Sequence, residues 1–278
     1  MNQANIKWDQ QIRFRHMEII ALWEGRLNTN HLCQQFGIGR QQASRDINHY
    51  LKLHPSNLDY DTKLKGYRPS GRFHAKYSNG SLNEYLHHLQ QLEFWDAARG
   101  IEVISSTAQL TSLVSLAERP VDPKVVRPLL NACRSGHRVK MHYASLASGN
   151  EVERVFVPHT LVHDGFRWHC RGYCETQKAY LDLVLTRIRS IPKRLHASEH
   201  LKEGDVDWNE QVSFTAVPNP LFNPKQQRIV AADYGFETEL HITTRKALLN
   251  YQLRALQISS PIQQFDLNTQ MLVVKPEL

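Results

Sequence analysis

The spacing of apolar residues predicts three helices in the first part of the chain. A first helix is expected from Gln11 to Glu24, where apolar side chains recur at helical spacing and a glycine ends the run. A second, short helix is expected from about Asn30 to Phe36, with Thr29 as its candidate N-cap. After the tight turn Gly37-Ile38-Gly39, a third helix runs from about Arg40 to Leu51. Its apolar stripe consists of Ala43, Ile47, Tyr50 and Leu51.

The face of the third helix opposite this stripe is polar and almost free of acidic residues, because Asp46 lies nearer the stripe. A helix, a short helix, a glycine-containing turn and a polar-faced helix follow one another in the order of a helix-turn-helix. Arg, Gln, Asn and Ser side chains suit base edges and phosphates in a major groove. The candidate DNA contacts on this helix are Arg40, Gln41, Gln42, Ser44, Arg45 and Asn48. An exposed helix in an ordinary bundle has the same pattern, so this alternative stays open.

The segment after the third helix is expected to form a β-hairpin with a basic tip. Two β-prone runs, Leu58–Tyr60 and Tyr67-Arg68, flank a tip that contains Lys63 and Lys65. A hairpin in this position is the wing of a winged helix-turn-helix, where lysines meet phosphates as point charges and add affinity more than specificity. Lys63, Lys65 and Arg68 are therefore candidate DNA contacts, although a charged turn that stays in water has the same composition.

The middle of the chain changes from helical to strand periodicity. Residues 83–116 are expected to be largely helical, three prolines mark a linker, and a helix covers about Val125 to Arg134. Alternating apolar and polar residues then predict a strand that begins at Arg138 and a second strand over Val152–Val157.

Three further strands are expected between Pro158 and Ile191, with Asp164-Gly165 as a two-residue hairpin turn. Beyond the turn, two sets of side chains alternate: Phe166, Trp168 and Cys170 on one face, and Arg167, His169 and Arg171 on the other. We expect the first set to enter a core. The second set is suited to line a pocket for an anionic ligand, because guanidinium groups bind carboxylate and phosphate oxygens as a fork. Most Arg residues face water, so a solvated face is the alternative.

The last part of the chain follows a polar crossover and is expected to be a separate α/β unit. Arg228–Asp233 and Thr238–Thr243 have strand patterns, and residues 245–256 have a helical pattern. The MLVVK run near the end predicts one more short strand.

The excess positive charge lies almost entirely in the first part of the chain. Residues 1–80 carry 12 Lys and Arg against 6 Asp and Glu, whereas the remaining residues carry 22 against 21. A basic segment on a near-neutral body favours a polyanionic partner, with nucleic acid as the first candidate. A basic face that serves only solubility is the alternative.

Composition indicates neither a metal or cofactor nor a membrane. The four cysteines form no CxxC pair and, with the nearby histidines, match no standard zinc spacing, so we expect free thiols, no metal and no cofactor. No run approaches the roughly 18 apolar residues of a membrane span. The first residues lack the apolar centre of a signal peptide. We therefore expect a cytoplasmic protein.

Several of these residues, in this order and spacing, resemble the WYL-domain regulators of bacteria. That family is named for a Trp-Tyr-Leu run in a small Sm-like β-barrel, and the run here is Trp168-His169-Cys170, which departs at two of the three letters. The fuller set is similar to the branch of repressors beside phage-defence operons of the BREX and CBASS type. It consists of Tyr143-x-Ser145, Arg154, Pro158-His159, Arg167-Trp168-His169-x-Arg171 and Arg187-Ile188. The resemblance covers essentially the whole chain.

This resemblance implies an α+β fold in three parts joined by a helical linker at residues 96–130. A winged helix-turn-helix is expected at residues 1–95, and a Sm-like (SH3-like) small β-barrel at 131–195. A C-terminal α/β extension at 205–278 would dimerise or gate the pocket. The resemblance also implies that one side of the barrel gathers a ligand site from Tyr143, Ser145, Arg154, His159, His169, Arg171 and Arg187.

The position of His159 is left open by the sequence. Simple hairpin register would pair His159 with Cys170, on the face of Trp168. Either a bulge near Pro158 turns His159 toward the pocket, or His159 is structural.

We expect a regulator and not an enzyme, because the chain contains no GxSxG, Walker A, HExxH or GxGxxG motif. The expected function is a dimeric transcriptional regulator, a repressor by resemblance, that binds a palindromic operator in double-stranded DNA. Its barrel would sense an anionic effector such as a nucleotide or a short nucleic acid. One alternative is a metal-independent nucleic-acid-processing enzyme that uses His169 as general base. Another is an interaction module without a ligand.

Overall fold

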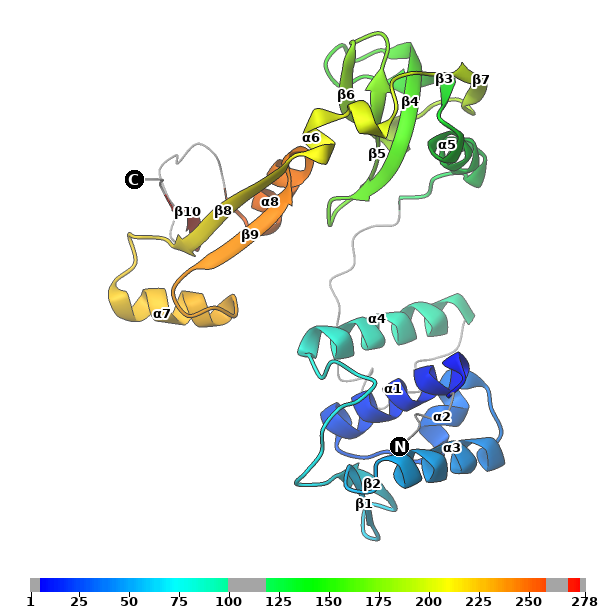
Figure 1. Ribbon diagram of the computed structural model, residues 1–278, viewed down its shortest axis with the longest axis vertical. Coiled ribbons are helices and arrows are strands. Elements are labelled where there is room, and N and C mark those ends of the chain that lie inside the picture. The colour runs from blue at the N-terminus through cyan, green and yellow to red at the C-terminus, as the bar shows by residue number, and fades with distance from the viewer. Residues whose placement is uncertain (1–5, 100–118, 259–269, 276–278) are drawn as a thin grey trace. The chain divides into compact units, whose positions relative to one another are not determined.

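The computed structural model describes residues 6–99, 119–258 and 270–275. The chain divides into two compact units, Met1–Ser115 and Leu116–Leu278 (Figure 1). Within the described ranges, no helix combines the length and the apolar character that a membrane span requires.

The N-terminal unit has the element order of a winged helix-turn-helix (Figure 1). Its elements are α1 (Trp8–Glu24), α2 (Thr29–Phe36), α3 (Arg40–Leu53), β1 (Leu58–Asp61), β2 (Gly66–Pro69) and α4 (Leu82–Arg99). α1 and α2 each end at a glycine with a left-handed backbone, Gly25 at φ 70° and Gly37 at φ 64°. The three predicted helices and the hairpin are confirmed. The predicted helix over residues 83–116 is confirmed within α4, and its later part lies outside the described residues.

The N-cap of α2 is Asn28 and not the predicted Thr29. The Asn28 side chain accepts a hydrogen bond from the backbone N–H of Asn30, while His31 Nδ1 accepts one from the backbone N–H of Asn28. This reciprocal capping box satisfies two backbone donors that have no partner within the helix.

The apolar stripe of α3 packs against α1, and of its four predicted residues only Leu51 is half-buried. Ala43, Ile47 and Tyr50 are buried, and the Phe14 ring of α1 lies edge-on to the Tyr50 ring with 5.4 Å between centroids. Because this stripe is covered, the opposite face of α3 is the one left to solvent.

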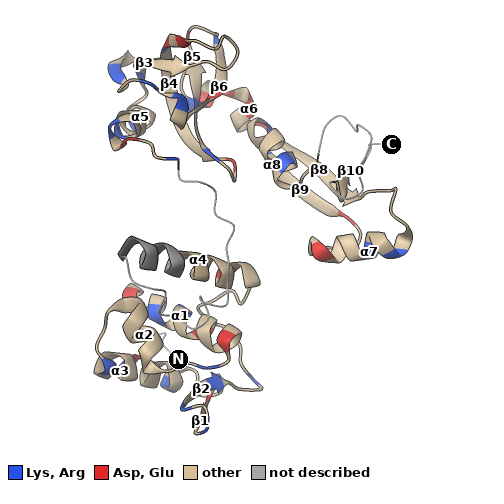
Figure 2. Cartoon of the chain, turned by 180° about the vertical axis from the view of Figure 1, so that it is seen from behind, with Lys and Arg blue, Asp and Glu red and all other residues tan. Residues whose placement is uncertain are grey.

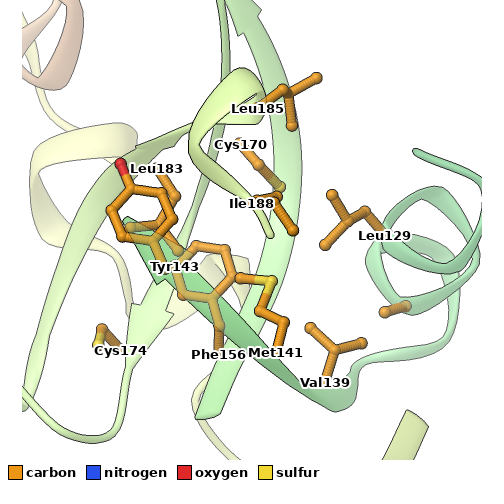
Figure 3. Close-up of a cluster of buried hydrophobic side chains, with 11 residues drawn as sticks. Leu129, Val139, Met141, Tyr143, Phe156, Cys170, Cys174, Leu183, Leu185 and Ile188 are labelled. Atoms are coloured by element: carbon orange, nitrogen blue, oxygen red, sulfur yellow. The ribbon is translucent and has the colours of Figure 1, made fainter. Parts of the chain in front are cut away.

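A five-stranded antiparallel sheet and one helix form the first half of the C-terminal unit. Its elements are α5 (Pro123–Ser135), β3 (His137–Ala144), β4 (Glu151–His163), β5 (Trp168–Cys174), β6 (Ala179–Val184), the 3-10 turn η2 (Leu185–Arg187) and β7 (Lys193–Ala197). The strand order is β6-β5-β4-β3-β7. Leu129 of α5 packs with Val139, Met141 and Phe156 from one face of the sheet (Figure 3).

The sheet differs from the predicted one at its edges. β7 was not expected, because it lies in the segment that the sequence presents as a polar crossover. No strand pairing among the described residues joins the edge strands β6 and β7. The closure of the sheet into a Sm-like barrel therefore stays a prediction.

The β4–β5 hairpin also differs from the prediction at its tip. The strands end at His163 and begin again at Trp168, so four residues connect them in place of the predicted two-residue turn. Asp164 accounts for the difference, because its carboxylate accepts hydrogen bonds from the backbone N–H groups of Phe166 and Arg167.

The predicted apolar face of β5 is wrong for two of its three residues. Phe166 and Trp168 remain 50% and 51% exposed, and only Cys170 is buried. Both aromatic residues lie at the tip of the β4–β5 hairpin, and neither belongs to the apolar cluster that packs with Leu129 of α5. The solvated alternative for the other face is wrong for His169 and Arg171, which are 3% and 5% exposed, whereas the Arg167 side chain is 31% exposed.

The second half of this unit is built on a three-stranded sheet of order β10-β8-β9. Its elements are η3 (Lys202–Gly204), α6 (Val206–Asn209), β8 (Gln211–Pro218), α7 (Pro224–Asp233), β9 (Leu240–Arg245), η4 (Lys246–Leu248), α8 (Leu249–Ala255) and β10 (Leu272–Val274). The predicted strand over Arg228–Asp233 is wrong, because these residues belong to α7. Asn223 caps this helix at the backbone N–H groups of Lys225 and Gln226, and this start signal outweighs the β-branched residues that follow.

Candidate functional site

The polar face of α3 is open to solvent. The exposed residues are Arg40, Gln41, Ser44, Arg45 and Asn48. Gln42 is half-buried and donates from Nε2 to Asp46 Oδ2 at 3.1 Å. The same carboxylate is buried and accepts from Arg13 Nε at 2.8 Å and from Gln10 Nε2 at 2.8 Å. The acidic residue of α3 is thus neutralised by α1, and the exposed face carries no carboxylate.

The β1–β2 hairpin adds basic side chains to this unit. Lys and Arg residues, blue in Figure 2, occur on α3 and on the hairpin, where Lys63, Lys65 and Arg68 are exposed. Asp61 shapes the tip, because its Oδ1 accepts from the backbone N–H groups of Lys63 and Leu64 at 2.8 Å and 3.0 Å. Arg68 Nη1 lies 3.7 Å from Asp61 Oδ2, so its charge is partly paired.

A buried carboxylate that the sequence reasoning missed holds this unit together. Glu18 of α1 is 1% exposed and accepts from Tyr50 Oη of α3 at 2.7 Å. Its Oε2 accepts from the backbone N–H groups of Tyr77 and Ser78 at 2.7 Å and 2.8 Å, and Lys76 N–H also donates to it. Glu18 therefore connects α1, α3 and the chain that leaves the hairpin. An acidic residue inside an apolar run was the available signal.

The predicted ligand residues of the C-terminal unit do not share one face of the sheet. Arg154 pairs with Met141, so it points to the face that packs on α5. Tyr143 lies on that face too, buried in the cluster of Figure 3, where its Oη accepts from the backbone N–H of Val184 at 3.1 Å. Arg154 Nη1 donates to Cys174 Sγ at 3.8 Å. These two residues belong to the core side of the sheet.

His169 and Arg171 point to the opposite face. Strand alternation separates them from Cys170, and Arg171 pairs with Asp182 of β6. Ser145 lies in the loop after β3 and Arg187 in η2. The convergence of all seven predicted residues on one side is therefore wrong for this pairing of strands.

A bulge in β4 brings His159 to the face of Arg171. The register shifts between Pro158, which pairs with Gly172, and Thr160, which pairs with Arg171. His159 is the extra residue, and its Nε2 lies 3.0 Å from Asp205 Oδ2. Gly172 permits the close approach, because a Cβ at this position would collide with Val157 O. Of the two possibilities left open, the bulge is the one found.

Arg171 is held by two carboxylates from distant parts of the unit. Its Nε donates to Asp205 Oδ2 at 2.6 Å and its Nη2 to Asp205 Oδ1 at 2.9 Å, which is the forked geometry of an Arg–carboxylate pair. Its Nη1 donates to Asp182 Oδ1 at 3.3 Å. The side chains of Arg171 and Asp205 are 6% and 1% exposed. Burial alone raises the pKa of Asp205, but hydrogen bonds from Arg171 and His159 lower it below the usual value.

Two further contacts extend this network. Tyr251 Oη of α8 donates to Asp182 Oδ2 at 2.8 Å, and the Tyr251 ring lies 5.1 Å from the His169 ring. His169 Nε2 lies 2.8 Å from Asp164 Oδ2. Burial alone raises the pKa of Asp164, but hydrogen bonds from the Arg167 backbone and from His169 lower it to about 2.

This arrangement is a buried network of ion pairs and hydrogen bonds that joins the five-stranded sheet to α6 and α8. Sequence reasoning missed its partners Asp182, Asp205 and Tyr251, which lie 11, 34 and 80 positions after Arg171. Asp164 is close to Arg171 in the sequence, but the sequence reasoning interpreted it only as a turn residue. Within the described ranges, no group of three His, Cys, Asp or Glu side chains is placed to hold a metal ion.

Comparison with known families matches three successive segments of the chain. The family model described as the BrxR transcriptional regulator winged helix-turn-helix domain matches residues 9–91, and the WYL domain matches residues 124–192. The BrxR transcriptional regulator C-terminal dimerization domain matches residues 211–277. A "DNA-binding transcriptional repressor CapW" of Pseudomonas aeruginosa is 32% identical over 254 residues, covering 91% of this chain and 84% of the relative. The chain belongs to the BrxR/CapW family of transcriptional regulators.

Further members of the BrxR/CapW family lie at a similar distance. A CapW repressor of Stenotrophomonas maltophilia is 31% identical over 262 residues, with 92% of this chain and 86% of the relative covered. Among solved structures, Proteasome accessory factor B/C (PafBC) of Arthrobacter aurescens is 13% identical and covers 98% of this chain and 44% of that chain, with a TM-score of 0.32. The expectation of a regulator is confirmed, and a nucleic-acid-processing enzyme is not favoured.

Proposed function

We propose that this BrxR/CapW family member is a dimeric repressor that binds a palindromic operator in double-stranded DNA with α3 and the β1–β2 hairpin. The observation that carries the proposal is the exposed, carboxylate-free face of α3, which presents Gln41, Ser44, Arg45 and Asn48. Side chains of these types contact base edges and phosphates in a major groove. The relatives named as DNA-binding transcriptional repressors support the same function. Such a protein would act in the cytoplasm. The resemblance to repressors beside phage-defence operons suggests that it controls phage-defence genes.

The second part of the proposal is that the WYL domain senses an anionic effector, a nucleotide or a short nucleic acid. Its support is the buried cationic fork of Arg171 beside His159 and His169, since such a fork suits phosphate as well as carboxylate oxygens. Closure of the sheet into a Sm-like barrel belongs to the same proposal.

Replacing Arg45 by alanine is expected to weaken operator binding and to relax sequence preference. Loss of a bidentate contact to guanine costs about 1–3 kcal/mol, which is roughly 5- to 150-fold in affinity. Gel-shift titration of the operator and of operators with single base changes measures both effects. Unchanged affinity and unchanged site preference would show that Arg45 does not read bases.

The matched control for this experiment is Lys65→Ala, which removes one exposed charge from the hairpin tip. We expect similar weakening for operator and unrelated DNA, and a smaller dependence of affinity on salt, because a phosphate contact carries no sequence information. Equal behaviour of the two variants would argue against separate roles for α3 and the hairpin.

The protein is expected to be a two-fold symmetric dimer in solution. One helix-turn-helix reads too few bases to select a single genomic site, and two-fold dimers on palindromic sites solve this problem. The match of residues 211–277 to a dimerization domain supports this part. Light scattering at micromolar concentration should return twice the chain mass of 32.2 kDa. The monomer mass, with and without operator DNA, would exclude the dimer.

A further inference from the structure

The anion-binding fork of Arg171 is filled by a carboxylate of the same chain. Asp205 receives two of its N–H donors at 2.6 Å and 2.9 Å, and both side chains are almost fully buried. The two carboxylate oxygens occupy the positions that two oxygens of a phosphate group would take. A ligand anion cannot share these donors without lying beside the charge of Asp205, which repels it.

Asp205 also fixes the segment that leads from the five-stranded sheet to β8. Its Oδ1 accepts from the backbone N–H of Trp208 at 3.2 Å and caps α6. The buried Trp208 ring packs edge-on to His159 at 5.5 Å, and the Arg245 guanidinium at the end of β9 lies 4.8 Å above it. The Asp205–Arg171 pair therefore holds α6 against the five-stranded sheet. Because β8 follows α6 directly, the pair also fixes the start of the three-stranded sheet.

We propose that Asp205 competes with the effector for Arg171. The anionic group of the effector displaces the Asp205 carboxylate and thereby releases α6 from the five-stranded sheet. The proposal rests on the anionic effector of the proposed function and states how binding at that site is transmitted. An occupant must present two oxygens of one anionic group to the fork, and for the nucleotide or short nucleic acid of the proposed function that group is a phosphate or phosphodiester. Asp182, the second partner of Arg171, stays in place and keeps the guanidinium oriented.

The proposal makes effector affinity depend on the strength of the internal pair. Binding that requires a free fork is weakened in proportion to the fraction of time the fork is free, because the apparent dissociation constant is the intrinsic one divided by that fraction. Asp205→Asn removes the charge but keeps the shape, and asparagine remains a good N-cap for α6. This variant should therefore fold and present a freer fork.

The test uses inorganic pyrophosphate as probe and isothermal calorimetry on the full-length protein. Asp205→Asn is expected to bind pyrophosphate about tenfold or more tightly than the wild type, within the range of usual coupling strengths. The double variant Arg171→Gln with Asp205→Asn should lose this binding. The control Asp207→Asn makes the same charge change two residues away, on a side chain that is 54% exposed and pairs with Lys246, and should bind as the wild type does.

A second readout follows the release itself. Pyrophosphate should increase hydrogen exchange at the Trp208 amide and the other α6 amides in the wild type, and Asp205→Asn should show faster exchange there without the probe. Binding that leaves α6 exchange unchanged would overturn the release.

The outcomes separate this inference from the proposed function. If wild type and Asp205→Asn bind pyrophosphate equally through Arg171, the anion site stands and internal competition is wrong. If no variant shows binding that depends on Arg171, both the anion site at this residue and the competition fail. Operator recognition by α3 is judged independently with Arg45→Ala.

Discussion

Replacing Arg171 by alanine is expected to destabilise the C-terminal unit strongly. The substitution leaves the Asp205 and Asp182 carboxylates without their cation, and these side chains are 1% and 14% exposed. Removing one partner of a buried ion pair costs roughly 3–5 kcal/mol, because the remaining charge is kept from water. Hydrogen exchange of the β5 amides, measured with and without urea, reports the free energy of opening of this unit separately from the N-terminal unit.

The matched control is Arg189→Ala, which removes an arginine from an exposed pair. Arg189 Nε lies 3.7 Å from Glu151 Oε1, and both side chains are at least half exposed. Exposed pairs of this kind contribute at most about 1 kcal/mol. Similar losses for the two variants would mean that the Arg171 network is far weaker than its geometry suggests.

Loss of an effector response in Arg171→Ala has two explanations, a missing ligand contact and a loosened C-terminal unit. Asp205→Asn separates them, because a ligand contact predicts a gain in anion affinity and a purely structural pair predicts only a loss in stability. Substitution of Asp205 therefore distinguishes the two roles of Arg171, whereas removal of Arg171 itself does not.

The helices of the N-terminal unit were predictable because their signals are local. Apolar spacing, glycine ends and the basic hairpin tip all lie within a few residues of the elements they define. The errors there are small shifts: the N-cap of α2 is Asn28 in place of Thr29, and α1 begins at Trp8 in place of Gln11. Local signals also explain the error at α7, where a capping box outweighed strand propensity.

The candidate site in the WYL domain was less predictable because its contacts are not local. Alternation correctly separated His169 and Arg171 from Cys170, but it could not tell which face is covered, or by what. Asp205 and Tyr251, which cover this face, lie far from β5 in the sequence. Nothing in the pattern of their own segments indicates that they contact β5. The bulge at His159, which adds one residue to β4, determines the face of the sheet on which this histidine lies.

Replacing Glu18 by alanine is expected to disrupt the winged-helix unit and, through it, operator binding. The buried carboxylate accepts hydrogen bonds from three consecutive backbone N–H groups, those of Lys76, Tyr77 and Ser78, and from Tyr50 Oη. Each buried donor left without a partner costs about 1–3 kcal/mol, so the loss is roughly 3–6 kcal/mol even if water reaches some of them. That loss is comparable with the whole stability of many domains, about 5–15 kcal/mol.

Glu18→Gln is the graded control for this prediction. The glutamine oxygen can still accept from the Tyr77 and Ser78 amides, and its NH₂ group can donate to Tyr50 Oη in place of accepting from it. We therefore expect Glu18→Gln to retain most of the fold and Glu18→Ala to lose it, as followed by hydrogen exchange of the α3 amides and by operator titration. Because α3 depends on Tyr50 for its position and the chain after the hairpin depends on the same carboxylate, both parts of the DNA-binding surface should weaken together. A Glu18→Ala variant that keeps α3 protected and binds operator normally would show that packing of the Phe14 and Tyr50 rings alone positions the recognition helix.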